Sequence, residues 1–243
     1  MTLSVHSRCF LASLVMTWIF PLVSQAQELT WSKLVQEDAP VLWWSFDGNQ
    51  PALPATQDDE APESTVAGDV KFGQKGPARS SSAFFTADNR SMEITPKAGV
   101  TKETDPGEKS PLDSDKGDAI TIEAWVKPNS FGGSRYMYIA GKGRTYGKGF
   151  SRDNHNYALR LQGQGPDAVL SFLFRSRKTD KSPGNWHRWT SKKGFKVDKG
   201  WHHVAVTYEF GKADSLVGYV DGQQVSGVWD MGGATDQPPV VDD

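Results

Sequence analysis

Alternating hydrophobic and polar positions predict a protein built from many short β-strands. The clearest case is residues 119–126 (AITIEAWV), where the apolar residues share one face and Thr121, Glu123 and Trp125 share the other. Further strands are predicted at residues 41–46, 70–72, 83–85, 92–94, 136–140, 156–161, 169–175, 186–191, 201–208, 216–220 and 223–225. Short strands at fairly regular spacing, separated by Gly, Pro, Asn and Asp, predict an all-β sandwich.

The segments between these strands carry other signals. Residues 29–37 predict a single short helix, whereas residues 49–68 are rich in Pro, Asp, Glu and Ala and predict an exposed loop. A second polar stretch covers residues 97–118. Asp221 and Gly222 separate two strands and predict a tight β-hairpin turn.

The first 26 residues have the pattern of a secretory signal peptide. Arg8 gives a weakly basic start, an apolar run follows over residues 9–23, and the small residues Ser24 and Ala26 predict cleavage before Gln27. The apolar run is shorter than the ~20 residues that a membrane-spanning helix needs. We therefore expect a secreted, periplasmic or cell-envelope protein with no membrane span after cleavage; an uncleaved anchor is the alternative.

Composition narrows the chemistry of the mature chain. Cys9 is the only cysteine and lies in the predicted signal peptide, so disulfides, thiolate metal sites and cysteine nucleophiles are not expected after cleavage. Lys and Arg number 27 and Asp and Glu 29, a balance that gives no electrostatic case for nucleic-acid binding. A secreted domain of this kind must be held together by its core or by bound ions.

Four segments, in a fixed order, resemble a laminin-G-like (LamG) jelly-roll domain of the concanavalin A-like lectin/glucanase type. They are AITIEAWVKP (119–128), IAGKGR (139–144) with the two strands after it, WHHVAVTY (201–208) and GYVDGQ (218–223). Residues 43–47 resemble the opening strand of such a domain. The resemblance implies an antiparallel two-sheet jelly-roll sandwich over residues 41–243, preceded by a short lead-in segment, 27–40.

The end of the sequence departs from the LamG pattern. Such domains usually continue after the 218–225 hairpin with two more strands, and the last of these pairs near the first strand. The sequence ends at residue 243 with neither motif. We therefore expect a C-terminally incomplete jelly roll, either the N-terminal part of a longer exported protein or the product of a truncated gene.

The acidic residues do not predict a catalytic centre. Retaining glycanases of this architecture place an acid and a nucleophile at alternate positions of one strand, about 5–5.5 Å apart. Residues 103–108 (ETDPGE) match that spacing, but Pro106 and Gly107 do not fit the interior of a sheet strand. We interpret them as a solvated acidic loop. Glu123 is the only acid centred in a strong strand, and we expect no enzymatic activity.

Asp113, Asp115 and Asp118 are the best candidate metal ligands, and Asp47 is a further candidate at the end of the first predicted strand. Closely spaced carboxylates in a Gly-containing loop offer the hard oxygen ligands that Ca²⁺ takes. LamG-like domains often carry calcium, so the resemblance adds support. The loop does not follow the EF-hand order, because Asp118 holds the glycine position. A polar turn leading into residues 119–126 is the alternative.

Aromatic and basic residues form the candidate ligand-binding set. Trp186 and Arg188 lie on one face of a predicted strand, where a sugar ring would stack on the indole and the guanidinium would bind its hydroxyls. Core packing is the alternative, because tryptophan usually buries most of its area. The other candidates for this surface are Tyr136, Tyr146, Arg144 and Trp229.

These observations favour a non-catalytic, extracytoplasmic recognition module that binds carbohydrate or an extracellular protein surface. One alternative is a structural or adhesion module that spaces the other domains of a larger protein. A second alternative is a glycanase of the same fold, which would need the paired-carboxylate strand that the sequence does not contain.

Overall fold

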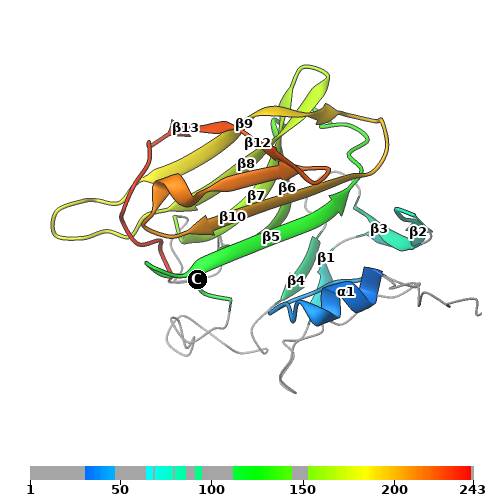
Figure 1. The fold of residues 1–243 in the computed structure, drawn as a ribbon, viewed down its shortest axis with the longest axis horizontal. Coiled ribbons are helices and arrows are strands. Elements are labelled where there is room, and N and C mark those ends of the chain that lie inside the picture. The colour runs from blue at the N-terminus through cyan, green and yellow to red at the C-terminus, as the bar shows by residue number, and fades with distance from the viewer. Residues whose placement is uncertain are drawn as a thin grey trace, which may run out of the picture.

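Two antiparallel β-sheets pack face to face as a sandwich in the computed structural model, which describes residues 31–46, 64–67, 69–78, 80–85, 91–94, 112–143 and 153–241 (Figure 1). The first sheet has the order β12-β11-β10-β5, and the second has the order β13-β9-β8-β7-β6. The strands of the first are β5 (Ala119–Val126), β10 (His202–Glu209), β11 (Val217–Val220) and β12 (Gln223–Val225). Those of the second are β6 (Tyr136–Gly143), β7 (His155–Gln164), β8 (Asp167–Arg175), β9 (Trp186–Lys196) and β13 (Gly227–Met231). The predicted all-β sandwich is confirmed.

Smaller elements accompany the sandwich, and all but one of them come before β5 in the chain. Helix α1 (Trp31–Glu37) agrees with the predicted helix. The remaining elements are two antiparallel pairs, β1 (Ser64–Ala67) with β4 (Ser91–Ile94) and β2 (Val70–Lys75) with β3 (Ser81–Phe85), and the short 3₁₀ helix η1 (Ala213–Ser215). Within the described residues, no helix has the length and hydrophobicity to cross a membrane.

Two sequence-based predictions are wrong, and one strand was not predicted. Residues 41–46 do not form a strand; Phe46 has a φ of 53°, which ends an extended conformation, and its ring packs edge-on against Phe85 at 6.0 Å. Residues 64–67, expected in a loop, form β1 because they pair with the distant β4. Strand β13 was not predicted, and it pairs with β9 along the edge of the five-stranded sheet.

The hairpin at Asp221 and Gly222 is confirmed. Both residues have positive φ values, 51° and 75°, and Val220 pairs with Gln223 across the turn. Positive φ at both central residues is the condition for a type I′ turn, whose twist matches that of the flanking strands. The hairpin joins β11 to β12.

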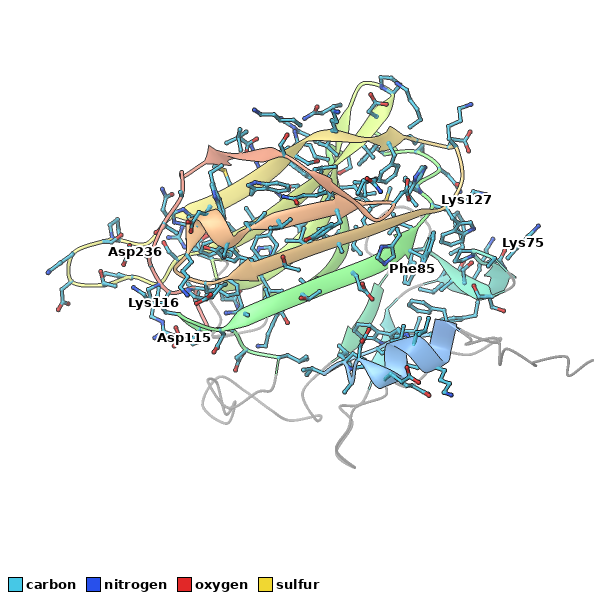
Figure 2. All side chains as sticks on the ribbon, in the orientation of Figure 1. Lys75, Phe85, Asp115, Lys116, Lys127 and Asp236 are labelled. Carbon is cyan, nitrogen blue, oxygen red and sulfur yellow. The ribbon has the colours of Figure 1, made fainter. Side chains whose placement is uncertain are left out.

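Aromatic side chains from both sheets dominate the core. Figure 2 shows side chains distributed over both sheets, with Asp115, Lys116 and Asp236 at one end of the sandwich. Tyr208 on β10 contacts Phe172 of the opposite sheet, with ring centroids 5.5 Å apart, and burial raises its pKa to about 12. The buried members of the core are Tyr157, Leu159, Leu161, Ala168, Leu170, Phe172, Phe174, Trp189, Phe195, Val204, Val206, Tyr208, Phe210 and Val220.

His187 is a buried titratable group beside this core. Its ring stacks on Phe174 at 5.1 Å, Nδ1 lies 2.9 Å from the Gly233 carbonyl oxygen, and Nε2 lies 3.1 Å from the Ser176 hydroxyl. Because a carbonyl can only accept, Nδ1 carries the proton and Nε2 accepts from Ser176. Burial lowers the pKa of His187 below its ordinary value of 6.5; the charge of Arg175 lowers it further, and the bond to Gly233 opposes both.

This depressed pKa predicts a loss of stability on acidification. Well above pH 6.5 the ring is neutral in both the folded and the unfolded chain. As the pH falls below that value, the unfolded chain binds a proton that the folded chain resists, so the free energy of unfolding decreases. We expect His187→Gln to have a lower free energy of unfolding than the wild type at pH 8, measured by urea unfolding. Between pH 6.5 and about 5, that free energy should fall less in the variant than in the wild type. Equal slopes would contradict the assignment.

Candidate ligand-binding face

The outer face of the five-stranded sheet, which points away from the four-stranded sheet, gathers the candidate ligand-binding residues. Strand β9 alternates, so Trp189 packs in the core while Trp186 and Arg188 lie on the outer face. Strand pairing aligns Tyr138, Arg160, Ser171 and Thr190 in one row across β6, β7, β8 and β9. Residues far apart in the chain thereby become neighbours on one surface.

Arg188 is held in place by two strands. Its Nε and Nη2 donate to the two carboxylate oxygens of Asp230 on β13, at 2.7 and 3.1 Å, and its Nη1 donates to the Tyr136 hydroxyl on β6. The hydrogen bond to Asp230 raises the pKa of Arg188, and the carboxylate neutralises its charge. Arg188 and Tyr136, both predicted from the sequence, therefore form one constellation.

Arg160 lies at the centre of this face and is 4% exposed. Its Nη2 donates to the Ser171 hydroxyl at 2.9 Å and its Nη1 to the Tyr138 hydroxyl at 3.4 Å. The guanidinium carbon is 4.1 Å from the ring centroid of Tyr136, which is a cation–π distance. Burial lowers the pKa of Arg160, and the hydrogen bond with Tyr138 counteracts part of that effect.

Trp186 lies on the same face beside an aromatic pair. Its ring meets His155 edge-on, with centroids 5.5 Å apart, and His155 stacks against Tyr138 at 6.1 Å. His155 reaches this face because β7 has a bulge: Lys142 pairs with Tyr157 and Gly143 with His155, which leaves one extra residue between them. The bulge reverses the alternation of the strand at that point.

The structure brings together three of the six predicted ligand-binding residues, namely Tyr136, Trp186 and Arg188. Arg144 and Tyr146 lie outside the described residues. The prediction that Trp229 belongs to this surface is wrong. Trp229 pairs with Trp189, packs against the core, and donates from Nε1 to the Ala213 carbonyl at 3.1 Å.

Sequence reasoning missed four residues of the outer face. The missed set is Tyr138, His155, Arg160 and Asp230. For Arg160 a signal was present, because a charged residue stands between the apolar Leu159 and Leu161 at an alternate position of a predicted strand. His155 gave no such signal, since only the bulge brings it to this face.

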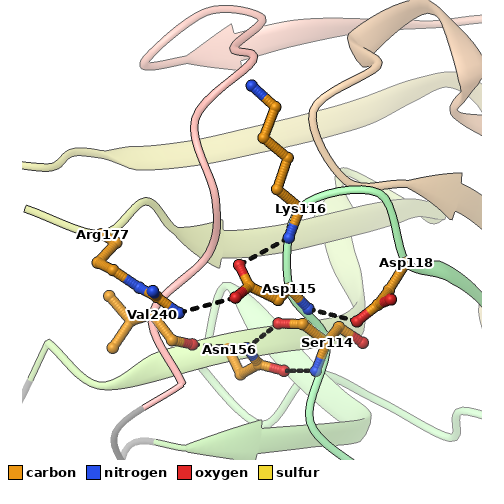
Figure 3. A network of polar contacts seen from close by, with 7 residues as sticks. All are labelled: Ser114, Asp115, Lys116, Asp118, Asn156, Arg177 and Val240. Atoms are coloured by element: carbon orange, nitrogen blue, oxygen red, sulfur yellow. Dashed lines mark hydrogen bonds and ion pairs between the residues drawn. The ribbon is translucent and has the colours of Figure 1, made fainter. Parts of the chain in front are cut away.

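The predicted metal loop forms a compact polar turn at the end of the sandwich (Figure 3). The Asp113 carboxylate lies 2.7 Å from Lys142 Nζ, and the Asp115 carboxylate 3.2 Å from Arg177 Nη2. Asp118 accepts a hydrogen bond from the Asp115 amide at 2.8 Å. Over the described ranges, no cluster of three or more potential metal ligands occurs. Calcium binding stays a prediction, and Asp47 lies outside the described residues.

Glu123 lies on the opposite side of the sandwich, on the outer face of the four-stranded sheet. Its Oε2 is 3.5 Å from His203 Nε2, and the hydrogen bond from His203 lowers the pKa of Glu123. Trp125, two residues further along β5, packs against the same histidine at 5.2 Å. This acid is therefore separated by the core from the face that carries Trp186 and Arg188.

Comparison with known proteins identifies the fold family. A laminin-G family model, described as the concanavalin A-like lectin/glucanases superfamily, matches residues 102–240 and confirms the resemblance found in the sequence. The chain matches no curated protein and no solved structure in these comparisons. The matched region contains every strand of the two main sheets.

Proposed function

The chain belongs to the concanavalin A-like lectin/glucanases superfamily, and from this membership we propose that it is a non-catalytic module that binds carbohydrate. The binding surface is the outer face of the five-stranded sheet. We also propose that the protein is exported, because residues 1–26 have the pattern of a signal peptide and laminin-G-like domains are commonly extracellular.

The observation that carries the carbohydrate proposal is the combination of aromatic and hydrogen-bonding groups on the outer face. Trp186 and Tyr138 offer flat rings on which the apolar face of a sugar can stack. Arg188, fixed by Asp230 and Tyr136, offers an oriented group for sugar hydroxyls beside these rings. Because its partners already hold it in place, the cost of ordering Arg188 on binding is small.

A non-catalytic role is supported by the carboxylates of this sheet. Its five strands contain only Asp167 and Asp230, on β8 and β13. Each is ion-paired: Asp167 lies 2.8 Å from Lys196 Nζ, and Asp230 binds Arg188. A retaining glycosidase needs two carboxylates about 5–5.5 Å apart, one of them free to exchange a proton. The two aspartates lie on different, non-adjacent strands and serve as counter-ions.

The proposal predicts that Trp186→Ala weakens polysaccharide binding about tenfold or more, since the buried aromatic anchors of an interface carry most of its binding energy. The measurement is affinity electrophoresis against a panel of neutral and acidic soluble polysaccharides. Trp125→Ala is the matched control, because Trp125 is 39% exposed on the other sheet. If Trp125→Ala lost binding and Trp186→Ala did not, the ligand would lie on the four-stranded sheet, which would contradict this proposal. If no polysaccharide retained the protein, carbohydrate binding would be refuted.

A further inference from the structure

We propose that the carbohydrate bound by the outer face is acidic, and that Arg160 binds its carboxylate. This inference rests on the carbohydrate-binding function proposed above and names the class of sugar.

The arginines of the sandwich differ in whether a carboxylate lies beside them. Arg188, Arg175 and Arg177 each lie within ion-pair distance of an aspartate, at 2.7, 3.4 and 3.2 Å.

Arg160 is the exception among these arginines. It is the most buried of them, and its hydrogen-bond partners are the hydroxyls of Ser171 and Tyr138, with no carboxylate among its contacts in the described part of the chain. Asp230 does not serve it, because both of its oxygens bind Arg188. A buried guanidinium stays protonated and costs free energy unless an anion compensates its charge. A ligand carboxylate would supply that anion.

The donors of Arg160 suit a carboxylate. Its Nε has no hydrogen-bond partner within the described residues, whereas Nη2 makes one bond, to Ser171. Since Nη2 carries two N–H groups, its bond to Ser171 leaves one of them over. Together, a free Nη2–H and the Nε–H can bind both oxygens of a carboxylate as a fork. Arg160 is thus oriented by Ser171 with a bidentate site left over.

Two neighbours add groups that match sugar hydroxyls. Gln162 is two residues along β7 on the same face, and Thr190 is aligned with Ser171 across β8 and β9. Both side chains are more than nine-tenths buried, and Gln162 Oε1 and Thr190 Oγ1 lack hydrogen-bond partners in the described structure. Buried polar atoms without partners are rare in native proteins. A uronic acid presents a carboxylate flanked by hydroxyls, so it would satisfy all three residues.

Tyr138 links the buried guanidinium to the surface. Its ring centroid is 5.4 Å from the Arg160 guanidinium carbon, and the residue is 46% exposed. Its hydroxyl is 3.4 Å from Nη1, well beyond the usual hydrogen-bond length of about 2.9–3.0 Å. A carboxylate would form a shorter, charge-assisted bond in its place.

The test compares native polyuronates with their neutral counterparts. Polygalacturonate, alginate and hyaluronan are each titrated by calorimetry beside the same polymer after carboxyl reduction, which removes the charge and keeps the sugar stereochemistry. We expect the wild type to bind at least one native polyuronate about ten- to hundredfold more tightly than its reduced form. Arg160→Gln should reduce that affinity to the level of the reduced polymer and leave binding of the reduced polymer unchanged.

Two further variants separate recognition from folding. Arg160→Lys keeps the charge but loses the fork, so it should bind the polyuronate with an intermediate affinity. Arg177→Gln removes an arginine that pairs with Asp115 away from this face, and it should bind like the wild type. If Arg160→Gln fails to fold, the wild-type comparison still tests whether the ligand is acidic, and Arg160→Lys tests whether Arg160 binds its carboxylate.

The outcomes distinguish this inference from the function on which it rests. Equal wild-type affinity for the native and reduced polymers would overturn the carboxylate assignment and leave carbohydrate binding intact. Preference for dextran sulfate over dextran, with no preference for any carboxylate, would overturn it in favour of a sulfated ligand. Failure of every neutral and acidic polymer to bind would refute carbohydrate binding itself.

Discussion

Replacing Trp189 with alanine is expected to lower the free energy of unfolding by about 3–5 kcal/mol. Trp189 is 5% exposed and belongs to the core between the two sheets. Two glycines pack against its indole: a Cβ at Gly218 would lie 2.7 Å from Cη2, and one at Gly227 would lie closer still to Cε2 and Cζ2. Because these neighbours have no side chains to move inward, the cavity would not collapse, and its full cost would be felt.

Urea unfolding followed by circular dichroism measures this effect. Trp125→Ala removes the same side chain from an exposed position and should cost no more than about 1 kcal/mol. A loss below about 1 kcal/mol for Trp189→Ala, equal to that of Trp125→Ala, would mean that the indole does not hold the sheets together.

Replacing Asn156 with alanine is expected to cost about 2–4 kcal/mol, since it leaves several buried polar groups unpaired. Asn156 is fully buried. Its Oδ1 accepts from the Ser114 amide at 3.0 Å, and its Nδ2 donates to the Ser114 and Val240 carbonyls at 2.9 and 2.5 Å (Figure 3). One side chain thus ties the segment before β5 and the segment after β13 to β7.

The C-terminal segment should loosen in the same variant. Its backbone already pairs beyond the end of β8, where the Arg177 amide donates to the Pro238 carbonyl and the Val240 amide to the Arg175 carbonyl, both at 2.8 Å. We expect limited proteolysis to remove this segment sooner from Asn156→Ala than from the wild type. Asn185→Ala is the control, because Asn185 is exposed and its side chain bonds only the next amide. Equal stability and equal cleavage of the two variants would contradict the role of Asn156.

The fold was predictable from the sequence where local alternation and tertiary pairing agree. Strand β5 was predicted to the residue, because its apolar positions face the core and Glu123 and Trp125 face solvent. The apolar run at residues 41–46 looked like a strand, yet no local pattern reveals the left-handed backbone of Phe46. For β1 the error is the reverse. Its polar surroundings indicate a loop, and it forms a strand only because it pairs with the distant β4.

The candidate site was predictable to a smaller extent. Alternation placed Trp186 and Arg188 on one face of β9, but not opposite Tyr136, because that neighbourhood depends on the order of strands in the sheet. Arg160 could not be recognised for the same reason, because its partners come from two other strands, β6 and β8. Lys142, which pairs with one aspartate of the predicted metal loop, also comes from a distant strand. The spacing of residues along the chain shows which groups are neighbours in sequence. It does not show which charged residues of distant strands pair with them.

Locating the bound carbohydrate on the protein by NMR tests the proposed binding face directly. The ¹⁵N-labelled protein is titrated with oligosaccharides of the polymer that retains it best. We predict chemical-shift changes for the Trp186 indole and for the Nε resonances of Arg160 and Arg188, with the Trp125 indole unchanged. Shifts confined to Trp125 and the strands around it, with Trp186 unmoved, would contradict the claim that the outer face of the five-stranded sheet binds carbohydrate.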